Sequence, residues 1–159
     1  FKNINFDAVY SSDLLRAQKT AEIITLEHNL VIQTTKLLRE RKCGKFEGKR
    51  VEFLSEFNKL YDKLTDEKRF RHKIDENAES DEELVSRFIT FIREAALAYL
   101  GKNILVVTHG GIMRIFLLHI GYLSDKYFSS ARIPNASHVR LLSDGVEFFV
   151  EETKGIKKE

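Results

Sequence analysis

The run Ile-Leu-Val-Val-Thr-His-Gly-Gly at residues 104–111 constrains the fold of this chain more than any other feature. Its apolar half is typical of a buried strand, and the amphipathic stretch after the glycines, Ile112 to His119, is typical of a helix. Ligands of open α/β sheets bind beyond the carboxyl ends of the strands, and the amino ends of helices attract anions. The run therefore predicts an α/β fold with His109 at an anion site, which favours phosphate chemistry.

Composition fits one ordinary globular domain of 159 residues, 43% hydrophobic and 31% charged, which is enough chain to bury a core. The net charge of +2 is small, and basic residues are interleaved with acids, so nothing favours nucleic acid as a partner. No apolar run approaches the ~18 residues that span a bilayer, and we expect no membrane association. The single cysteine, Cys43, excludes an internal disulfide and fits a reducing compartment, so the expected location is cytoplasmic.

Hydrophobic periodicity predicts strands that alternate with helices. The expected strands are Phe6–Tyr10, Leu30–Ile32 and Ile104–Val107, and the expected helices cover residues 14–29, 50–64, 81–100 and 112–119. Residues 11–13 are expected to cap the first helix, and Ser80 with Glu83 has the form of a capping box for the third. The charged residues 62–77 lack periodicity and predict a mobile surface segment.

Two further apolar runs, Val139–Leu142 and Val146–Val150, are joined by Ser-Asp-Gly, which is typical of a hairpin. Alternating strands and helices closed by a hairpin imply a three-layer α/β/α architecture. Its sheet would be mostly parallel with an antiparallel edge, and helices would cover both faces. We expect a single domain over residues 1–152, followed by a polar tail at residues 153–159.

Three side chains could meet at the carboxyl edge of such a sheet. Arg16 and His109 each follow a predicted strand, and an irregular segment carries Glu40. A guanidinium binds phosphoryl groups in bidentate fashion, an imidazole stabilises developing charge, and a carboxylate moves a proton. Taken alone, Arg16 is more typical of a solvated helix than of a binding site, and Glu40 is more typical of charge balance in a basic loop. A histidine between a buried strand and Gly-Gly, in contrast, favours function. The other histidines form no metal cluster, so we expect no metal and no other cofactor.

Four blocks in this order resemble the histidine phosphatase superfamily, also called phosphoglycerate mutase-like. Residues 11–21 are similar to its Ser-Ser-x-x-x-Arg-Ala-x-x-Thr-Ala block, and residues 38–48 to its Leu-x-Glu…Gly…Glu-Gly block. Glu79-Ser80 with Arg87 matches its Gly-Glu-Ser…Arg element, with Ala78 where glycine is usual. Residues 107–111 match its second histidine motif. The resemblance covers nearly the whole chain and implies the phosphoglycerate mutase-like fold.

The resemblance also implies roles for five residues. Arg16 would bind the transferred phosphoryl group, and His109 would be the second pocket histidine. Glu40 would protonate the leaving oxygen and then activate water. The Gly110 amide would add a backbone donor, and Arg41 would contact the substrate beyond its phosphate.

The function implied is that of a metal-independent phosphomonoester hydrolase that acts through a phosphohistidine on a small phosphorylated metabolite. A phosphoglycerate mutase and a non-catalytic phosphate-binding module are the alternatives. The short interval between Glu40 and Glu79 favours the phosphatase over the mutase. The physiological substrate and the oligomeric state stay open.

The chain departs from the family pattern at the nucleophile, which is a histidine in an Arg-His-Gly motif on the first strand. No Arg-His-Gly occurs in the sequence, and the only Arg-His pair, Arg71-His72, lies in the charged segment. We therefore expect that the sequence as given lacks an N-terminal strand and helix and does not contain the nucleophile. We also expect the 159 residues alone to be neither stable nor active.

Overall fold

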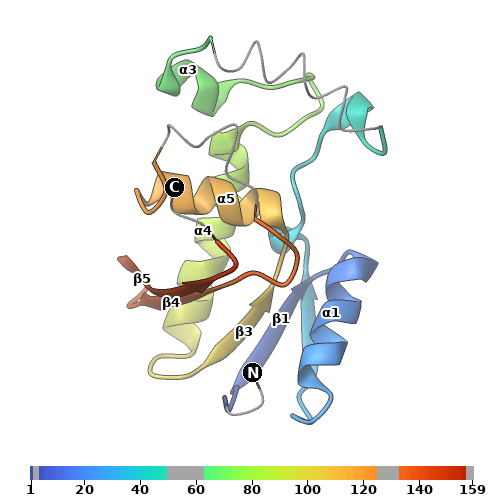
Figure 1. The fold of residues 1–159 in the computed structure, drawn as a ribbon, viewed down its shortest axis with the longest axis vertical. Helices are drawn as coiled ribbons and strands as arrows, with labels where there is room; N and C mark the ends of the chain where they lie inside the picture. Colours follow the sequence, from blue (N-terminus) through green and yellow to red (C-terminus); the bar gives the residue numbers. More distant parts are fainter. Residues whose placement is uncertain (2–3, 50–62, 125–132, 157–159) are drawn as a thin grey trace.

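A parallel sheet of three strands organises the structure, a computed structural model that describes residue 1 and residues 4–49, 63–124 and 133–156 (Figure 1). The central strand is β1 (Ala8–Ser12), with β2 (Ile32–Thr35) on one side and β3 (Ile104–Val107) on the other. Val9 lies opposite Ile32 of β2 and Leu105 of β3. The α/β class and the parallel sheet expected from the sequence are confirmed.

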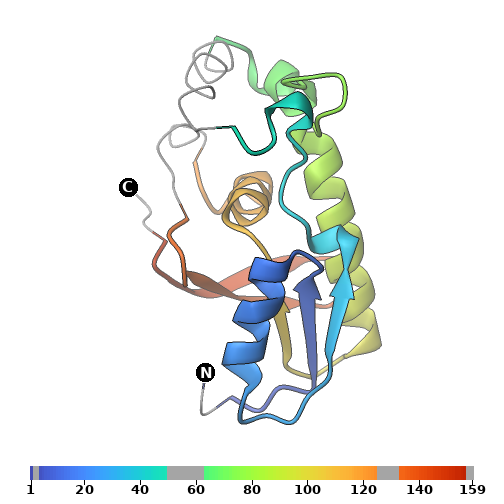
Figure 2. The ribbon, with the colours of Figure 1, turned by 90° about the vertical axis from the view of Figure 1, so that its right-hand side faces the viewer.

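Helices cover both faces of this sheet. In Figure 2, α1 (Leu15–Thr25) lies on one face and α4 (Asp81–Ala98) on the other. The side chains under α1 form one apolar cluster of Val9, Ala17, Ala21, Leu105 and Val107. A larger cluster joins α4 to α5 (Gly110–His119), and the rings of Phe88 and Phe116 meet edge to face within it at 5.1 Å.

The expected hairpin is present, with β4 (His138–Ser143) and β5 (Phe148–Lys154), but within the described residues it forms a separate antiparallel sheet rather than the expected edge of the parallel sheet. Its connection spans residues 144–147, and it includes Gly145 at φ +91° and an Asp144 carboxylate that accepts from two backbone N–H groups. Phe148 packs edge to face on Phe116 of α5, which joins the hairpin to the larger cluster. β5 continues to Lys154, two residues into the segment expected as a polar tail.

The first strand and helix differ in their limits from the sequence-based expectation. β1 begins and ends two residues later than expected, because Ser11 and Ser12 still pair with neighbouring strands. The expected capping of α1 is therefore wrong: its N-cap is Leu14, which has no side-chain cap, and the Ser12 hydroxyl accepts instead from the Leu14 N–H at 3.3 Å. The helix ends at Thr25, before Asn29, whose φ is +49°.

Several other expectations had mixed outcomes. The strand expected at Leu30–Ile32 lies at Ile32–Thr35. The charged residues 62–77 are not wholly irregular, because α3 (Asp66–Arg71) lies among them. The helix expected at residues 50–64 lies mostly outside the described residues. The capping box of α4 is confirmed: the Ser80 hydroxyl accepts from the Glu83 N–H, and the Glu83 carboxylate accepts from the Ser80 N–H.

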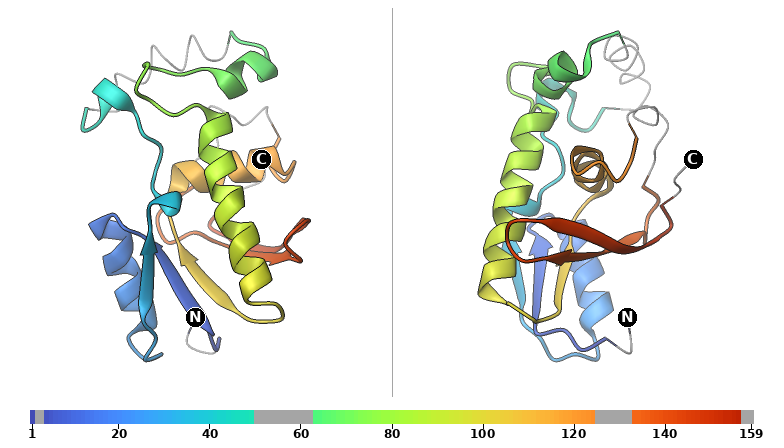
Figure 3. Two further views of the ribbon diagram at one scale, coloured as in Figure 1. Left: turned by 180° about the vertical axis from the view of Figure 1, so that it is seen from behind. Right: turned by 90° about the vertical axis from the view of Figure 1, so that its left-hand side faces the viewer.

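The carboxyl ends of all three parallel strands point toward the same end of the molecule. There the chain after β2 forms η1 (Lys36–Leu38), crosses over the sheet edge and forms η2 (Gly44–Phe46). The amino end of α5 lies at the same edge, directly after β3 (Figure 3). Among the described helices, none combines the length and apolar character needed to cross a bilayer. The fold thus gathers two helix starts and one connecting segment at a single sheet edge.

Candidate functional site

His109 occupies the junction between β3 and α5 as the N-cap of the helix. Its side chain is buried, with 8% of the residue exposed, and its Nε2 atom has no hydrogen-bond partner among the described residues. Buried polar atoms of folded proteins nearly always have a partner. The unpartnered nitrogen, next to a helix N-terminus, therefore leaves a position for a partner from outside the chain, either water or a ligand.

The surroundings of His109 keep its imidazole neutral in the absence of such a ligand. Burial lowers the pKa of His109 below its ordinary value of 6.5, and the positive charge of Arg16 lowers it further, while the Glu40 carboxylate opposes both effects. An arriving phosphate dianion would reverse this balance, because a negative charge nearby favours the imidazolium.

Arg16 lies in the first turn of α1, at the same sheet edge as His109. β1 and β3 are parallel neighbours, so the residues that follow them emerge side by side. Arg16 is exposed, and its guanidinium has no hydrogen-bond or ion-pair partner within the described part of the chain. A guanidinium with open donors beside a buried histidine can bind an anion in bidentate fashion.

The carboxylate of Glu40 caps the amino end of α5. Its Oε2 accepts from the Gly111 N–H and its Oε1 from the Arg41 N–H, both at 2.9 Å. A side chain at Gly111 would collide with this carboxylate, which explains the second glycine of the motif. Glu40 therefore reaches the helix start that follows His109, although the two residues are 69 positions apart along the chain.

Gly110 leaves its backbone donor open. Its N–H has no hydrogen-bond partner among the described residues, because Glu40 takes the N–H of Gly111 instead. A Cβ at Gly110 would lie 3.2 Å from the carbonyl oxygen of Ile133, which is close contact. The expected use of the Gly110 amide as an anion donor is compatible with this geometry and stays a prediction.

Arg41 is paired with a residue of α4. Its guanidinium pairs with the carboxylate of Asp81 in the first turn of α4, and only 18% and 3% of the two side chains are exposed. The structure thus brings Arg16, Glu40 and His109 to one sheet edge and commits Arg41 to α4. The expected contact of Arg41 with substrate stays a prediction.

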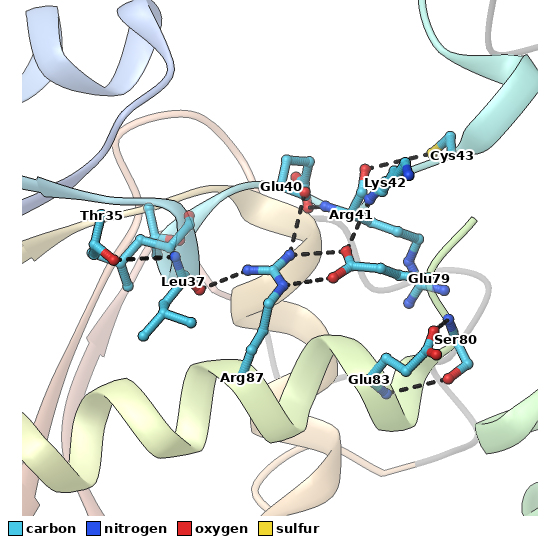
Figure 4. Close-up of polar contacts among 12 residues, drawn as sticks. Thr35, Leu37, Glu40, Arg41, Lys42, Cys43, Glu79, Ser80, Glu83 and Arg87 are labelled. Carbon is cyan, nitrogen blue, oxygen red and sulfur yellow. Dashed lines mark hydrogen bonds and ion pairs between the residues drawn. The ribbon is translucent and has the colours of Figure 1, made fainter. Parts of the chain in front are cut away.

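Figure 4 shows that the segment carrying Glu40 is also tied to α4 by a residue whose role the sequence did not indicate. The guanidinium of Arg87 donates to the carbonyl oxygens of Leu37 and Glu40 and to both carboxylate oxygens of Glu79. Arg87 and Glu79 are eight residues apart, which is not the spacing of a local helix pair. Only the family block containing both residues singled them out.

A second ion pair fixes the other side of this segment. Arg39 donates through Nε and Nη2 to the two carboxylate oxygens of Asp13, at 2.7 and 2.8 Å. The hydrogen bonds from Arg39 hold the pKa of Asp13 below its ordinary value, so the carboxylate stays charged at neutral pH. The turn before α1 and the segment after β2 are therefore linked across the sheet edge.

Comparison with known proteins identifies relatives over most of the chain. The family profile described as "Histidine phosphatase superfamily (branch 1)" matches residues 1–154. The phosphatase PhoE of Bacillus subtilis is 31% identical over 135 residues, covering 85% of this chain and 63% of that protein. A metal-independent phosphoserine phosphatase of Arabidopsis thaliana is 33% identical over 140 residues, covering 82% of this chain and 53% of that protein.

A solved structure supports the same relationship. The phosphoglycerate mutase of Bacillus anthracis is 26% identical, with a TM-score of 0.73 over 97% of this chain and 74% of that one. The chain spans only 46% to 63% of the length of the four curated relatives that it matches, which are therefore longer proteins. Within the described residues, no group of three histidine, cysteine or acidic side chains has an arrangement that could hold a metal ion.

The neutral state of His109 can be tested by NMR titration of its ring. We expect a pKa below 6.5 in the protein without added anion, because burial and Arg16 both disfavour the imidazolium. The substitution Arg16→Ala should raise this pKa, since it removes a positive charge and leaves the burial in place. Lys19→Ala, on the same helix but paired with Glu22, is the matched control and should leave it nearly unchanged. A pKa at or above 6.5 in the unmodified protein would contradict this reading of the site.

Proposed function

We propose that this chain, which belongs to the histidine phosphatase superfamily (branch 1), functions as a phosphatase. The protein would hydrolyse phosphomonoesters without a metal ion, through a phosphohistidine intermediate. The observation that carries the proposal is the buried Nε2 of His109, which lacks a partner among the described residues and lies at a helix start near Arg16. A phosphoryl group would supply the missing partner.

The three gathered side chains divide the chemistry among them. Arg16 would clamp two phosphoryl oxygens, and His109 would donate a hydrogen bond to a third as charge develops there. A histidine nucleophile forms a bond to phosphorus while the bond to the ester oxygen breaks, and Glu40 would give its proton to that oxygen. Glu40 would then take a proton from the water that breaks the phosphorus–nitrogen bond. We propose that the nucleophile lies outside these 159 residues, because the sequence has no Arg-His-Gly.

The names of two relatives support a phosphatase that acts on small molecules. The relative in Bacillus subtilis is called a phosphatase, and the relative in Arabidopsis is called a metal-independent phosphoserine phosphatase. By analogy we propose a small phosphorylated metabolite as substrate and no metal in the mechanism. A single domain over residues 1–152 and a cytoplasmic location remain predictions from the sequence.

A phosphoglycerate mutase is the second candidate. The specific observation in its favour is the structure of the Bacillus anthracis mutase, which shares 26% of aligned residues with this chain. A mutase would use the same pocket and return the phosphoryl group to a bound product rather than to water. Transfer of a labelled phosphoryl group between phosphoglycerates at a rate above its release as inorganic phosphate would favour the mutase.

If Glu40 is the general acid, the rate loss caused by Glu40→Gln should depend on how well the leaving group of the substrate departs without a proton. In the full-length protein, Glu40→Gln should slow hydrolysis of 2-glycerophosphate by about 100-fold or more, because its alkoxide leaving group needs a proton. Hydrolysis of p-nitrophenyl phosphate should slow by less than about 10-fold, since nitrophenolate leaves without protonation. Steady-state kinetics on both substrates measure this difference. Equal slowing of the two would remove Glu40 from the acid role.

The phosphohistidine predicts a covalent label at a defined place. Brief reaction of the full-length protein with a radiolabelled phosphate ester should leave acid-labile label on one histidine, as expected for a phosphorus–nitrogen bond. Peptide mapping should place that histidine outside the five histidines of this sequence. Label on His109 would contradict its role as a binding group. Absence of covalent label during turnover would contradict the two-step mechanism and leave direct attack by water.

A further inference from the structure

Arg87 directs its hydrogen bonds at the backbone around Glu40 rather than at the pocket. Its Nη1 donates to the Leu37 carbonyl at 2.6 Å and its Nη2 to the Glu40 carbonyl at 3.3 Å (Figure 4). The guanidinium is largely buried, with 16% of the side chain exposed. Its rigid planar fork can meet two carbonyls and a carboxylate together, which a lysine ammonium cannot do in one geometry.

Glu79 extends the same set of contacts past Glu40. Its two carboxylate oxygens accept from Nε and Nη2 of Arg87 at 2.7 and 2.9 Å, and its Oε2 also accepts from the Lys42 N–H at 2.9 Å. The Glu79 N–H donates back to the Lys42 carbonyl at 2.8 Å. Although burial raises the pKa of Glu79, the bonds from Arg87 and Lys42 hold it below its ordinary value. The carboxylate is therefore charged and fully engaged at neutral pH.

The opposite side of the segment is tied to β3 and α5. The Thr108 hydroxyl donates to the Leu38 carbonyl at 2.8 Å, and the Leu38 side chain is fully buried in the larger apolar cluster. Beyond it, the Glu40 carboxylate reaches the Gly111 N–H. The backbone of residues 37–42 is thus held from both sides, with Glu40 between the tied positions.

These contacts are better explained by a need to place the Glu40 side chain than by a contribution to the stability of the fold. A buried ion pair adds little net stability, because desolvation offsets the attraction between its charges. Here the partners contact the chain before Glu40, at Glu40 and after it, at Leu37, Glu40 and Lys42. Displacement of a reacting group by about 1 Å can cost about 100-fold in rate, so such fixing has a direct effect on chemistry.

We propose that Arg87 and Glu79 are positioning residues, which hold the backbone of residues 37–42 so that the Glu40 carboxylate lies at the amino end of α5 beside His109. Neither residue touches the substrate in this arrangement. The inference rests on the proposed function, since it assigns Glu40 the proton transfer. Its structural part, the placement of the carboxylate, stands on the contacts alone and has a separate readout.

The kinetic test compares two substrates and two arginines of α4 in the full-length protein. Arg87→Lys should slow 2-glycerophosphate hydrolysis by about 100-fold and p-nitrophenyl phosphate hydrolysis by less than about 5-fold, as loss of the acid does. When Arg87→Lys is added to Glu40→Gln, hydrolysis of 2-glycerophosphate should slow by less than about 3-fold further. Both substitutions remove the same effect, proton donation by Glu40, so their costs should not add. Arg93→Lys, an exposed site on the same helix, should alter neither rate. Equal slowing of both substrates by Arg87→Lys alone would overturn the proposal.

A second readout does not depend on activity. The Gly111 amide proton, which donates to Glu40, should shift in the NMR spectrum of Arg87→Lys in the same direction as in Glu40→Gln. Glu79→Gln, which keeps the size of the side chain, should produce a smaller shift of the same sign. Arg93→Lys should leave the resonance in place. An unmoved Gly111 resonance in Arg87→Lys would overturn the positioning role, whatever the kinetics show.

The two readouts separate failure of this inference from failure of the proposed function. If Glu40→Gln slows both substrates equally, the acid role fails, and the Gly111 resonance alone decides whether Arg87 places the carboxylate. If Glu40→Gln shows the expected difference and Arg87→Lys does not, the acid role stands and the positioning role is wrong.

Discussion

The candidate site depends on how the backbone of residues 37–42 is held between α4 and the start of α5. This segment has no long helix or strand of its own to fix it: its first two residues end the short helix η1, and η2 begins only after it. Its carbonyl groups are instead bound by Arg87 from one side and by Thr108 from the other. An ion pair between Arg39 and Asp13 joins it to the turn before α1. Side-chain donors thus bind the backbone carbonyl oxygens that neighbouring strands would bind in a sheet.

The electrostatic arrangement of the site suits an anion that arrives and leaves. Burial keeps His109 neutral, and Arg16 keeps an exposed guanidinium that has no partner among the described residues. Glu40 accepts from the Gly111 N–H of α5, and the neighbouring Gly110 N–H has no partner among the described residues. A bound phosphoryl group would favour the imidazolium and meet the open donors of Arg16. An anion bound there would thus meet both the Arg16 guanidinium and the Nε2 atom of His109, which has no partner among the described residues.

The sequence predicts structure best where local chemistry decides it. The apolar run before His109, the capping box of Ser80 and Glu83 and the hairpin after His138 each carry a signal within a few residues, and each is present in the structure. The cap of α1 was predicted wrongly, because long-range strand pairing kept Ser11 and Ser12 in β1. That competition between neighbours in space cannot be read from a single segment.

The sequence indicates which residues form the candidate site, but it does not indicate the hydrogen bonds and ion pairs that hold them in place. Strand order placed Arg16 and His109 at one edge, and a family block pointed to Glu40. The ion pair of Arg41 with Asp81 and the bonds from Arg87 to two carbonyls join residues 40 or more positions apart. Contacts of that kind depend on the packing of α4 against η1 and the segment that follows it, and they leave no periodic pattern in the sequence.

A crystal structure of the full-length protein with bound tungstate would show directly whether Arg16, His109 and Glu40 form one anion site. Tungstate has the shape and charge of phosphate, and its heavy atom can be located without ambiguity. We expect the anion to contact the Arg16 guanidinium and the Nε2 atom of His109, with the Glu40 carboxylate beside it and still bound to the Gly111 N–H. Tungstate bound elsewhere, or a Glu40 carboxylate turned away from α5 when the anion is present, would contradict this expectation.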